Sequence, residues 1–265
     1  YKHTTMGFIR DVERMPEMYD YSIEFFHRYY RPENTVIVLA GEVNRDEALR
    51  TVDRHWGDWK LDGAYSAEIP YEPRQGKPKA AYVEWPTPTL PWILVGFKGP
   101  RYSDEQKDMP AMDLISNLAF AESSELYQRL VVQEQKVDTL APLFEDHMDP
   151  YLVSVLARVK KKEDVGYVQD EILKTFESYT RKPVSGELLE AVKSHLRYGF
   201  ALSMDNSQAI AAHVAPYIAL RRDPETINRL YEIYGSISPE DIHEVAQKYF
   251  TDRSRTIVTL ASNGR

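Results

Sequence analysis

Carboxylate and imidazole side chains come close together at three places in the sequence, and each group has donor atoms that could bind a metal ion. Glu24 and His27 stand three residues apart in a predicted helix, the spacing that carboxylate-bridged metal sites use. The run Asp146–Asp149 precedes a predicted strand, and His243–Glu244 lies on the predicted solvent-facing side of an amphipathic helix. A single Glu–His pair is typical of a helix surface, and a polar run before a strand is typical of a hairpin loop. We therefore predict no catalytic or metal-binding residue at any of the three places.

Other chemistries are excluded by residue types and motifs that the sequence lacks. It has no cysteine, so disulfides, thiolate nucleophiles and cysteine-ligated metals are excluded. A chain without cysteine is compatible with both oxidising and reducing compartments. It has no glycine-rich phosphate loop and no Gly-x-Ser-x-Gly elbow, which argues against nucleotide binding and serine hydrolase chemistry. The 18 tyrosines indicate large packed or interface surfaces rather than a cofactor site.

The bulk composition is that of a folded protein without a nucleic-acid-binding surface. The 265 residues are 43% hydrophobic and 28% charged, enough to bury one large core or two ordinary ones. The formal net charge is −8, whereas phosphate neutralisation needs clustered lysine and arginine. The longest apolar stretches, Thr35–Gly41 and Pro91–Phe97, are far too short to cross a bilayer. The chain begins at Tyr1 rather than at a methionine and carries no signal peptide, so we expect further sequence upstream.

The first part of the chain shows a helix, a strand and a second helix, followed by a linker. Met15-Pro16-Glu17 opens a predicted helix that ends near Tyr30. The β-branched run Thr35–Ala40 is typical of a buried strand, and a second helix is predicted over residues 45–56. Residues 61–79 contain Pro70, Pro73, Gly76 and Pro78 and few large aliphatic residues, so they are the predicted linker.

Beyond the linker the pattern of strands and helices starts again. Strands are predicted over residues 80–85, 92–97, 151–159 and 256–261. Ser103 and Gln106 form a capping box that predicts a helix over residues 103–120. Further helices are predicted over residues 125–134, 164–179, 187–202 and 208–221. Asp223-Pro224 and Ser238-Pro239 each place a capping residue before a proline, which predicts two more helix starts. The chain is therefore predicted to be a mixed α+β protein.

One internal similarity organises these elements. The segment Arg28–Ala40 has the pattern of a helix end, a polar turn and a buried strand, and Lys248–Ala261 repeats that order. Each copy follows a Pro-Glu helix start, at Pro16-Glu17 and at Pro239-Glu240. Helix–turn–strand units are common enough to match by chance. The alternative is a duplicated domain whose first copy is truncated, with about 140 of its residues lying upstream.

Several short motifs in a fixed order resemble the pitrilysin/insulinase type of zinc metallopeptidase. Tyr1-Lys2-His3-Thr4-Thr5-Met6-Gly7 is similar to the family's Tyr-Arg-His-x-x-x-Gly segment. Tyr29–Asn34 and Gly41-Glu42-Val43 resemble the family's Tyr-Tyr-x-Pro-x-Asn turn and the end of the strand that follows it. Ser123–Val131 looks like the Ser-Ser-Arg-Leu-Tyr helix of the family's second domain. The likeness covers nearly the whole chain.

This resemblance implies a fold of two homologous α+β domains, each a mostly antiparallel sheet packed by helices on one side, the first domain being truncated. It also implies a zinc site, in which a His-x-x-Glu-His helix supplies two ligands and the general base and a later Glu supplies the third ligand. That motif belongs upstream of the segment matched by Tyr1–Gly7. No two of the histidines share a helical turn, the seven being His3, His27, His55, His147, His195, His213 and His243. We therefore expect no catalytic residue and no metal ligand here, and zinc only in the parent protein.

The family's substrate-binding pair also lacks a counterpart. Many members carry an Arg and, seven residues later, a Tyr that contact the scissile carbonyl. The match of the second-domain helix puts Val131 and Asp138 at these positions, and a shifted match puts Arg129 and Lys136 there. Family halves without the pair are often the zinc-bearing ones. The resemblance thus implies a zinc-bearing parent subunit whose pair comes from a partner half, and substrate-binding residues stay unassigned in this chain.

These observations predict three parts, namely residues 1–60 as the C-terminal remnant of the first, zinc-bearing domain, residues 61–79 as a linker, and residues 80–265 as the second, non-catalytic domain. The expected function is that of the zinc-free C-terminal part of a zinc endopeptidase, which hydrolyses peptides in a chamber between two halves. This part alone is expected to be inactive. The alternative is a non-catalytic scaffold or partner subunit of the same family, and an upstream His-x-x-Glu-His helix would separate the two.

The expected partners are peptide substrates of the parent protein and a second homologous half or subunit, with no nucleic acid and no membrane span. The bacterial periplasm and the cytoplasm are both compatible with the sequence. The truncated first domain is predicted to expose apolar faces around Phe25, Phe26 and Val36–Leu39. We expect the truncated first domain to stay folded only by packing against the second domain or another copy of the chain.

Overall fold

The computed structural model describes residues 7–60, 71, 73 and 75–262, and these fall into two compact units. The N-terminal unit draws on residues 1–72 and 203–224, and the sheet unit draws on residues 73–202 and 225–265. Contacts therefore group residues 203–224 with the start of the chain, whereas the sequence placed them in the second domain. The motif residues 1–6 and most of the predicted linker, residues 61–70, 72 and 74, lie outside the described residues.

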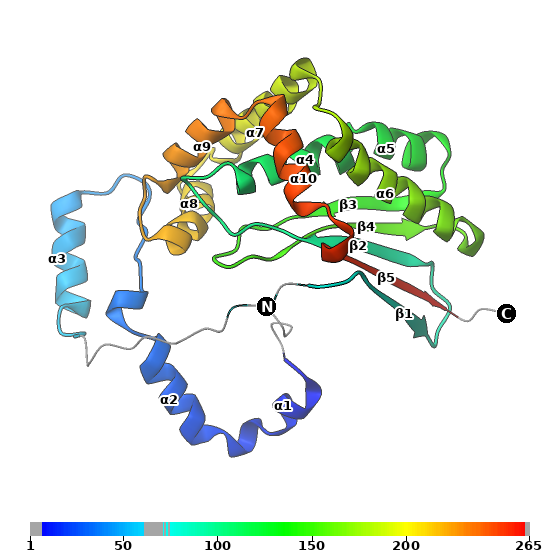
Figure 1. Cartoon of the computed structure of the whole chain (residues 1–265). Coiled ribbons are helices and arrows are strands. Elements are labelled where there is room, and N and C mark those ends of the chain that lie inside the picture. Colours follow the sequence, from blue (N-terminus) through cyan, green and yellow to red (C-terminus); the bar gives the residue numbers. More distant parts are fainter. Residues whose placement is uncertain (1–6, 61–70, 72, 74, 263–265) are drawn as a thin grey trace. The chain divides into compact units, whose positions relative to one another are not determined.

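The sheet unit is built on a five-stranded sheet of described residues with the order β1–β5–β2–β4–β3. The strands are β1 (Lys79–Trp85), β2 (Trp92–Lys98), β3 (Val137–Leu143), β4 (Leu152–Val159) and β5 (Arg255–Ser262). β1 pairs with β5 in parallel, and every other neighbouring pair is antiparallel. Figure 1 shows β5, the last described strand, lying between β1 and β2, the first two. The predicted α+β class with a mostly antiparallel sheet is confirmed.

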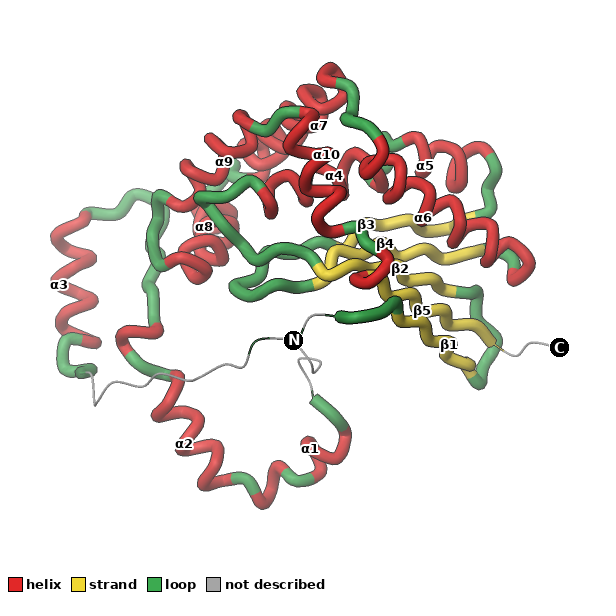
Figure 2. The backbone as a smooth tube through the Cα atoms, in the orientation of Figure 1, coloured by secondary structure: helices red, strands yellow, loops and turns green. Residues whose placement is uncertain are grey.

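Helices cover one face of this sheet (Figure 2). They are α4 (Asp108–Phe120), α5 (Glu125–Tyr127), α6 (Val165–Arg181), α7 (Gly186–Ser203), α9 (Thr226–Ser236) and α10 (Pro239–Tyr249). The covered face of β2 carries Ile93, Val95 and Phe97, which alternate with residues of the other face because strand side chains have a period of two. α4 is apolar nearly all round, as expected for a helix buried on most sides.

Four phenylalanine rings from different elements meet in the core of the sheet unit. The Phe176 ring on α6 lies 4.8 Å from Phe97 on β2, 4.7 Å from Phe120 on α4 and 4.8 Å from Phe250 after α10, between ring centroids. Such tilted and edge-on aromatic contacts add to the gain from burying apolar area. This cluster ties the last helix and strand of the chain to the first strands of the unit.

The described residues of the N-terminal unit form no comparable core. Its helices are α1 (Ile9–Glu13), α2 (Tyr19–Tyr29), α3 (Arg45–Trp56) and α8 (Ser207–Arg221). The Arg222 guanidinium at the end of α8 donates to the Glu33 carbonyl and to Asn34 Oδ1. At the start of α8, Ser207 lies close to Gly41, since a Cβ added to this glycine would be 3.6 Å from the Ser207 side chain. The turn Pro32–Asn34 and the extended residues 35–40 after it therefore run along α8.

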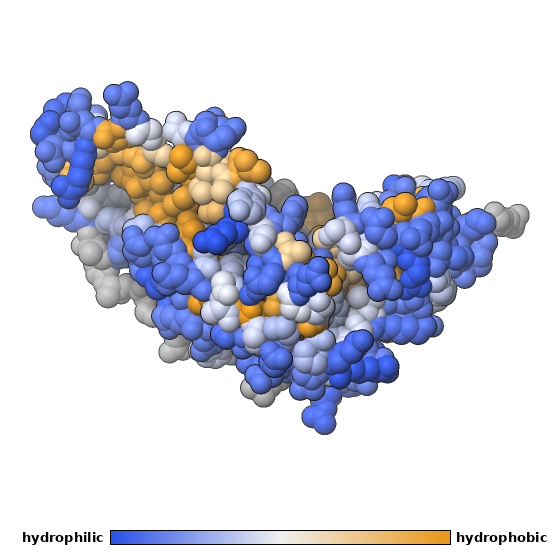
Figure 3. All heavy atoms as spheres, turned by 90° about the horizontal axis from the view of Figure 1, so that it is seen from above, coloured by the Kyte–Doolittle hydropathy of each residue, from blue (hydrophilic) through white to orange (hydrophobic). Residues whose placement is uncertain are grey.

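The prediction of a buried strand at Thr35–Ala40 is wrong. The segment is extended, but within the described residues it joins no sheet, and Val36, Ile37 and Leu39 are 48%, 46% and 57% exposed. A strand is buried only when neighbouring strands and a covering layer exist, and the described part of this unit supplies no second strand. Figure 3 shows apolar side chains gathered on the side where Figure 1 draws α3 and α8.

Several predicted helix boundaries also shift. Ser103 Oγ accepts from the Gln106 amide at 3.0 Å, but this bond closes a turn, and α4 begins at Asp108. The predicted helix 125–134 is one short α-turn followed by a π-helical turn, Gln128–Gln133. α9 begins at Thr226 rather than after Asp223, because Arg222 adopts a left-handed conformation and the chain must turn first. The Ser238 cap of α10 is confirmed, with Ser238 Oγ accepting from the Asp241 amide.

Candidate functional site

The structure keeps the three sequence candidates apart and gives each a local role. Glu24 and His27 are exposed on α2 in the N-terminal unit. His243 was predicted to face solvent, which is wrong, because its Nδ1 lies 2.9 Å from the Tyr179 carbonyl of α6 and the side chain is partly buried. Glu244 beside it is exposed, as predicted. Among the described residues, no group of three or more His, Asp or Glu side chains could hold a metal ion.

The Asp146–Asp149 run lies in the loop that joins β3 to β4, as predicted for a hairpin connection. Its Asp146 side chain is partly buried, and burial, followed by the charge of Asp113 on α4, raises the pKa of Asp146 to about 6. Asp113 was not predicted as a candidate from the sequence. An aspartate inside an otherwise apolar helix, with Asn117 one turn later, was the signal that could have found it.

In both possible matches of the substrate-binding pair, the matched residues pack or make polar contacts with other residues of the sheet unit. Val131 packs against the core, and Asp138 Oδ2 accepts an ion-pair contact from Arg158 Nη1 at 3.1 Å. In the shifted match, Arg129 donates to Glu171 and to the Tyr167 hydroxyl.

Lys136 of that shifted match is held in the same way, because it donates to Asp164. This hydrogen bond raises the pKa of Lys136 against the opposing effect of burial. Neither match therefore places an Arg and a Tyr where both could reach one peptide carbonyl. That a partner half supplies the Arg and the Tyr stays a prediction.

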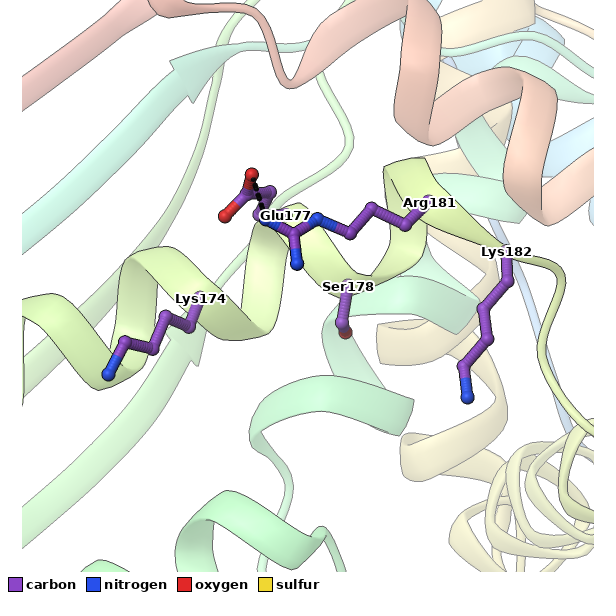
Figure 4. A pocket seen from close by; sticks show the side chains of 5 residues that line it. All are labelled: Lys174, Glu177, Ser178, Arg181 and Lys182. Atoms are coloured by element: carbon purple, nitrogen blue, oxygen red, sulfur yellow. Dashed lines mark hydrogen bonds and ion pairs between the residues drawn. The ribbon is translucent and has the colours of Figure 1, made fainter.

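A groove of about 540 Å³ lies along the C-terminal half of α6 and is lined by Lys174, Glu177, Ser178, Arg181 and Lys182 (Figure 4). Arg181 Nη2 reaches back to Glu177 Oε1 at 2.6 Å, and Lys174 Nζ is bonded to Glu171. The Ser178 hydroxyl donates to the Thr175 carbonyl of its own helix. The lining side chains come from α6 and from Lys182 directly after it, and they contain no nucleophile paired with a base. The groove does not form a catalytic site.

The face of the sheet that lies away from the core cluster is a wide, mainly apolar surface. The alternate residues Trp92 and Leu94 on β2 and Leu156 on β4 are partly exposed there. Arg158 adds a cation, with its guanidinium 5.5 Å from the centroid of the Trp92 ring. This surface can bind apolar side chains and one acidic or carbonyl group by ordinary contacts. Within the described residues, no helix is long and apolar enough to cross a membrane.

Comparison with known proteins relates this fold to one family. Residues 19–196 match the family described as the peptidase M16 inactive domain. A zinc protease from Helicobacter pylori, PqqE, is 24% identical over 266 residues, covering 98% of this chain and 58% of that protein. The solved structure of a Helicobacter pylori protease is 22% identical with a TM-score of 0.87, covering 96% of this chain and 61% of that one.

A chain in a structure of Complex III2 from Candida albicans has a TM-score of 0.80 at 16% identity and covers 98% of this chain. This chain spans less than two thirds of the length of the relatives it matches. The family match covers well over half of the chain, and the structural likeness extends over nearly all of it. The resemblance to the pitrilysin/insulinase type is therefore confirmed, and this chain belongs to the M16 peptidase family, most of it corresponding to that family's inactive domain.

Proposed function

We propose that this chain is the zinc-free part of a zinc-dependent endopeptidase that hydrolyses peptides in a chamber between two halves. The observation that carries the proposal is the similarity of 98% of the chain to a protein named a zinc protease, together with the match to the inactive domain of the M16 family. The zinc ligands and the general base then belong to the catalytic domain of the parent protein. Bound zinc would activate a water molecule there for attack on the peptide bond. This chain contributes no group to that step and is inactive alone.

The contribution of this chain is to enclose and orient the substrate. The partly exposed sheet face with Trp92, Leu94 and Leu156 suits a chamber wall, because it offers apolar area without a deep pocket that would select one side chain. Arg158, held by Asp138 and lying over Trp92, places a hydrogen-bond donor on the same face. A second homologous half or subunit closes the chamber and supplies the Arg and Tyr that contact the scissile carbonyl.

The division into residues 1–60, 61–79 and 80–265 forms part of this proposal. The internal similarity pairs Thr35–Ala40 with the strand that became β5. β5 lies between a parallel and an antiparallel neighbour, whereas Thr35–Ala40 has neither among the described residues. In the proposed first domain, a sheet like that of the second would supply neighbouring strands. These would pair with the backbone of Thr35–Ala40 and cover its apolar side chains. This supports the assignment of residues 1–60 to an incomplete first domain.

The second candidate function is a non-catalytic scaffold or partner subunit. The observation that favours it is the likeness to a chain in the Complex III2 structure, which matches this chain at a TM-score of 0.80. The fold alone serves both functions, so fold similarity does not decide between them. We place the peptidase first because the relative that matches nearly the whole sequence is named a zinc protease.

The test compares the parent protein with this chain alone. Metal analysis of the purified parent is expected to show one zinc per subunit. Cleavage of an internally quenched peptide should be abolished by a chelator and restored by zinc. This chain, at equal concentration, is expected to bind no stoichiometric zinc and to cleave nothing. Chelator-sensitive proteolysis by this chain alone contradicts the proposal, and a zinc-free, inactive parent that still assembles with a homologous subunit favours the scaffold.

A further inference from the structure

The outer face is the side of the sheet that lies away from the covering helices (Figure 2), and strand register sets its side chains in rows. One row holds Leu94 of β2, Leu156 of β4 and Val258 of β5, which lie opposite one another. Because side chains alternate along a strand, these three point away from Ile93 and Val95, which are completely buried in the core. All three are only partly buried, so an apolar strip crosses three strands of the outer face.

Cationic side chains lie on both sides of this apolar strip. Arg158 of β4 is one row away on one side, and Lys79 of β1 is one row away on the other. Lys98 of β2 follows one row beyond Lys79. Of the strand residues that the structure describes on the outer face, Asp138 is the one acid. The strands thus present a positive outer face, although the formal net charge of the whole chain is −8.

Arg158 is held in position by two neighbours. Its Nη1 lies 3.1 Å from Asp138 Oδ2, and its guanidinium carbon lies 5.5 Å from the centroid of the Trp92 ring. Its Nε is buried and has no hydrogen-bond partner among the described residues, whereas the side chain as a whole is 39% exposed. The exposed part of the guanidinium is therefore open to a ligand. A cation that is already fixed loses little conformational freedom when it binds a carboxylate.

We propose that the outer face binds extended acidic peptides, with apolar side chains on the strip and a carboxylate at Arg158. Successive rows are about 7 Å apart, which is the spacing of every second side chain in an extended peptide. A glutamate two positions from a leucine therefore reaches Arg158 when the leucine lies on the strip. A basic peptide would instead meet Arg158, Lys79 and Lys98, and like charges repel. The inference rests on the proposed function, because it names the substrate class of the chamber wall.

A second copy of this chain fits the outer face less well than an acidic peptide does. In a two-fold symmetric pair, the same surface patch lies on both partners. Each copy would then bring Lys79, Lys98 and Arg158 to a surface that carries the same three cations, with only Asp138 from each copy to balance them. An acidic peptide supplies the opposite charge and is the better match in electrostatic terms.

Binding of fluorescein-labelled peptides to this chain, measured by fluorescence anisotropy, tests the proposal without requiring catalysis. The probes are three peptides of one leucine- and valine-rich sequence, which carry glutamate, glutamine or lysine two positions from a leucine. The glutamate peptide is expected to bind about fivefold more tightly than the glutamine peptide, as a partly exposed ion pair allows. The lysine peptide should bind more weakly than both. Raising the salt concentration to about 1 M should remove most of the preference, because it screens the charges.

Variants of the outer face locate the preference. Arg158→Gln should lower the affinity for the glutamate peptide to that for the glutamine peptide. Asp138→Asn leaves the Arg158 charge without its carboxylate partner, so it should raise the preference above fivefold. Lys182→Gln is the matched control, because it removes the same charge from an exposed residue directly after α6, and the fivefold preference should persist. Circular dichroism checks that each variant is folded, and Asp138→Asn remains as a test if Arg158→Gln does not fold.

Equal affinities for the glutamate and glutamine peptides overturn the proposal, and so does a preference that persists in folded Arg158→Gln. Failure of all three peptides to bind overturns it as well. If sedimentation then shows a dimer that Trp92→Ala dissociates, the outer face belongs to a second copy of the chain. None of these results depends on zinc or on hydrolysis. The proposed function fails separately, in the metal analysis and the cleavage assay of the parent protein.

Discussion

The two units of this chain contain similar helix–turn–strand segments and bury them to very different extents. In the sheet unit, α10 buries Ile242 and Ala246 completely, and β5 is paired on both sides. In the N-terminal unit, α2 has no buried residue, and Thr35–Ala40 pairs with no described strand. Local sequence thus sets the helix and the extended backbone in both copies. Burial is decided by the neighbours that each copy finds.

The largest contrast is expected in amide exchange of the two extended segments. The amides of Thr256–Ala261 should be protected by at least about 1,000-fold, because they lie in a central strand whose opening requires most of the unit to unfold. Those of Val36–Ala40 should exchange close to the intrinsic rate. The measurement is exchange followed by mass spectrometry on this chain. Comparable protection of both segments would show that Thr35–Ala40 has a partner and would remove the contrast.

The same exchange measurement on the parent protein sharpens the comparison. If residues 1–60 belong to a first domain with its own sheet, the Val36–Ala40 amides gain protection there while those of β5 stay as they are. Exchange that stays fast in the folded parent contradicts the proposed domain division.

The second contrast is in the stability that the aromatic residue directly after α10 and the one directly after α2 contribute. Phe250→Ala should lower the free energy of unfolding of the sheet unit by about 3 kcal/mol, because it removes a ring that contacts Phe97 and Phe176. Tyr30 holds the corresponding position after α2 and is 59% exposed, so Tyr30→Ala should cost less than about 1 kcal/mol. Urea unfolding followed by fluorescence measures both. Equal losses would mean that the N-terminal aromatic face is packed in solution.

The third prediction uses the pH dependence that the buried acids give to the sheet unit. Burial and Asp113 raise the pKa of Asp146 from 3.8 to about 6, so the folded chain keeps a proton that the unfolded chain releases. The stabilisation is complete below pH 3.8 and is lost between pH 3.8 and pH 6. The free energy of unfolding of Asp146→Asn should therefore exceed that of the wild type by about 3 kcal/mol at pH 7 and by less than about 1 kcal/mol at pH 4. Urea midpoints at both pH values test this, and a constant difference between the two proteins would contradict it.

The smallest contrast is in the N-terminal caps of α10 and α2. Ser238 caps α10, and Ser238→Ala should cost about 1 kcal/mol. α2 begins after Met18, which provides no side-chain cap, so Met18→Ser should add about 0.5 kcal/mol of helix stability there. Circular dichroism during thermal unfolding measures both changes. No gain from Met18→Ser would indicate that α2 is held by contacts rather than by its own ends.

Elements with strong local signals were predictable from the sequence. The Ser238-Pro239 cap and the periodicity of residues 164–179 and 45–56 place α10, α6 and α3 close to their observed positions. β3 was missed because Asp138 and Pro142 interrupt its pattern. The structure explains the proline, which is tolerated on an edge strand such as β3, and pairs Asp138 with Arg158 of β4. The Asp113–Asp146 pair could not be predicted, because only the packing of the β3–β4 loop on α4 brings the two residues together.

The position of β5 has a consequence for the order of folding during synthesis. β1 pairs with no described strand except β5, and β2 needs β5 on one side, yet β5 is made about 170 residues after them. Until the residues of β5 have been made, β2, β4 and β3 can form a three-stranded sheet, but β1 has no described strand to pair with. The sheet unit therefore closes only after β5 has been made, and shielding of β1 by a chaperone is most useful until then.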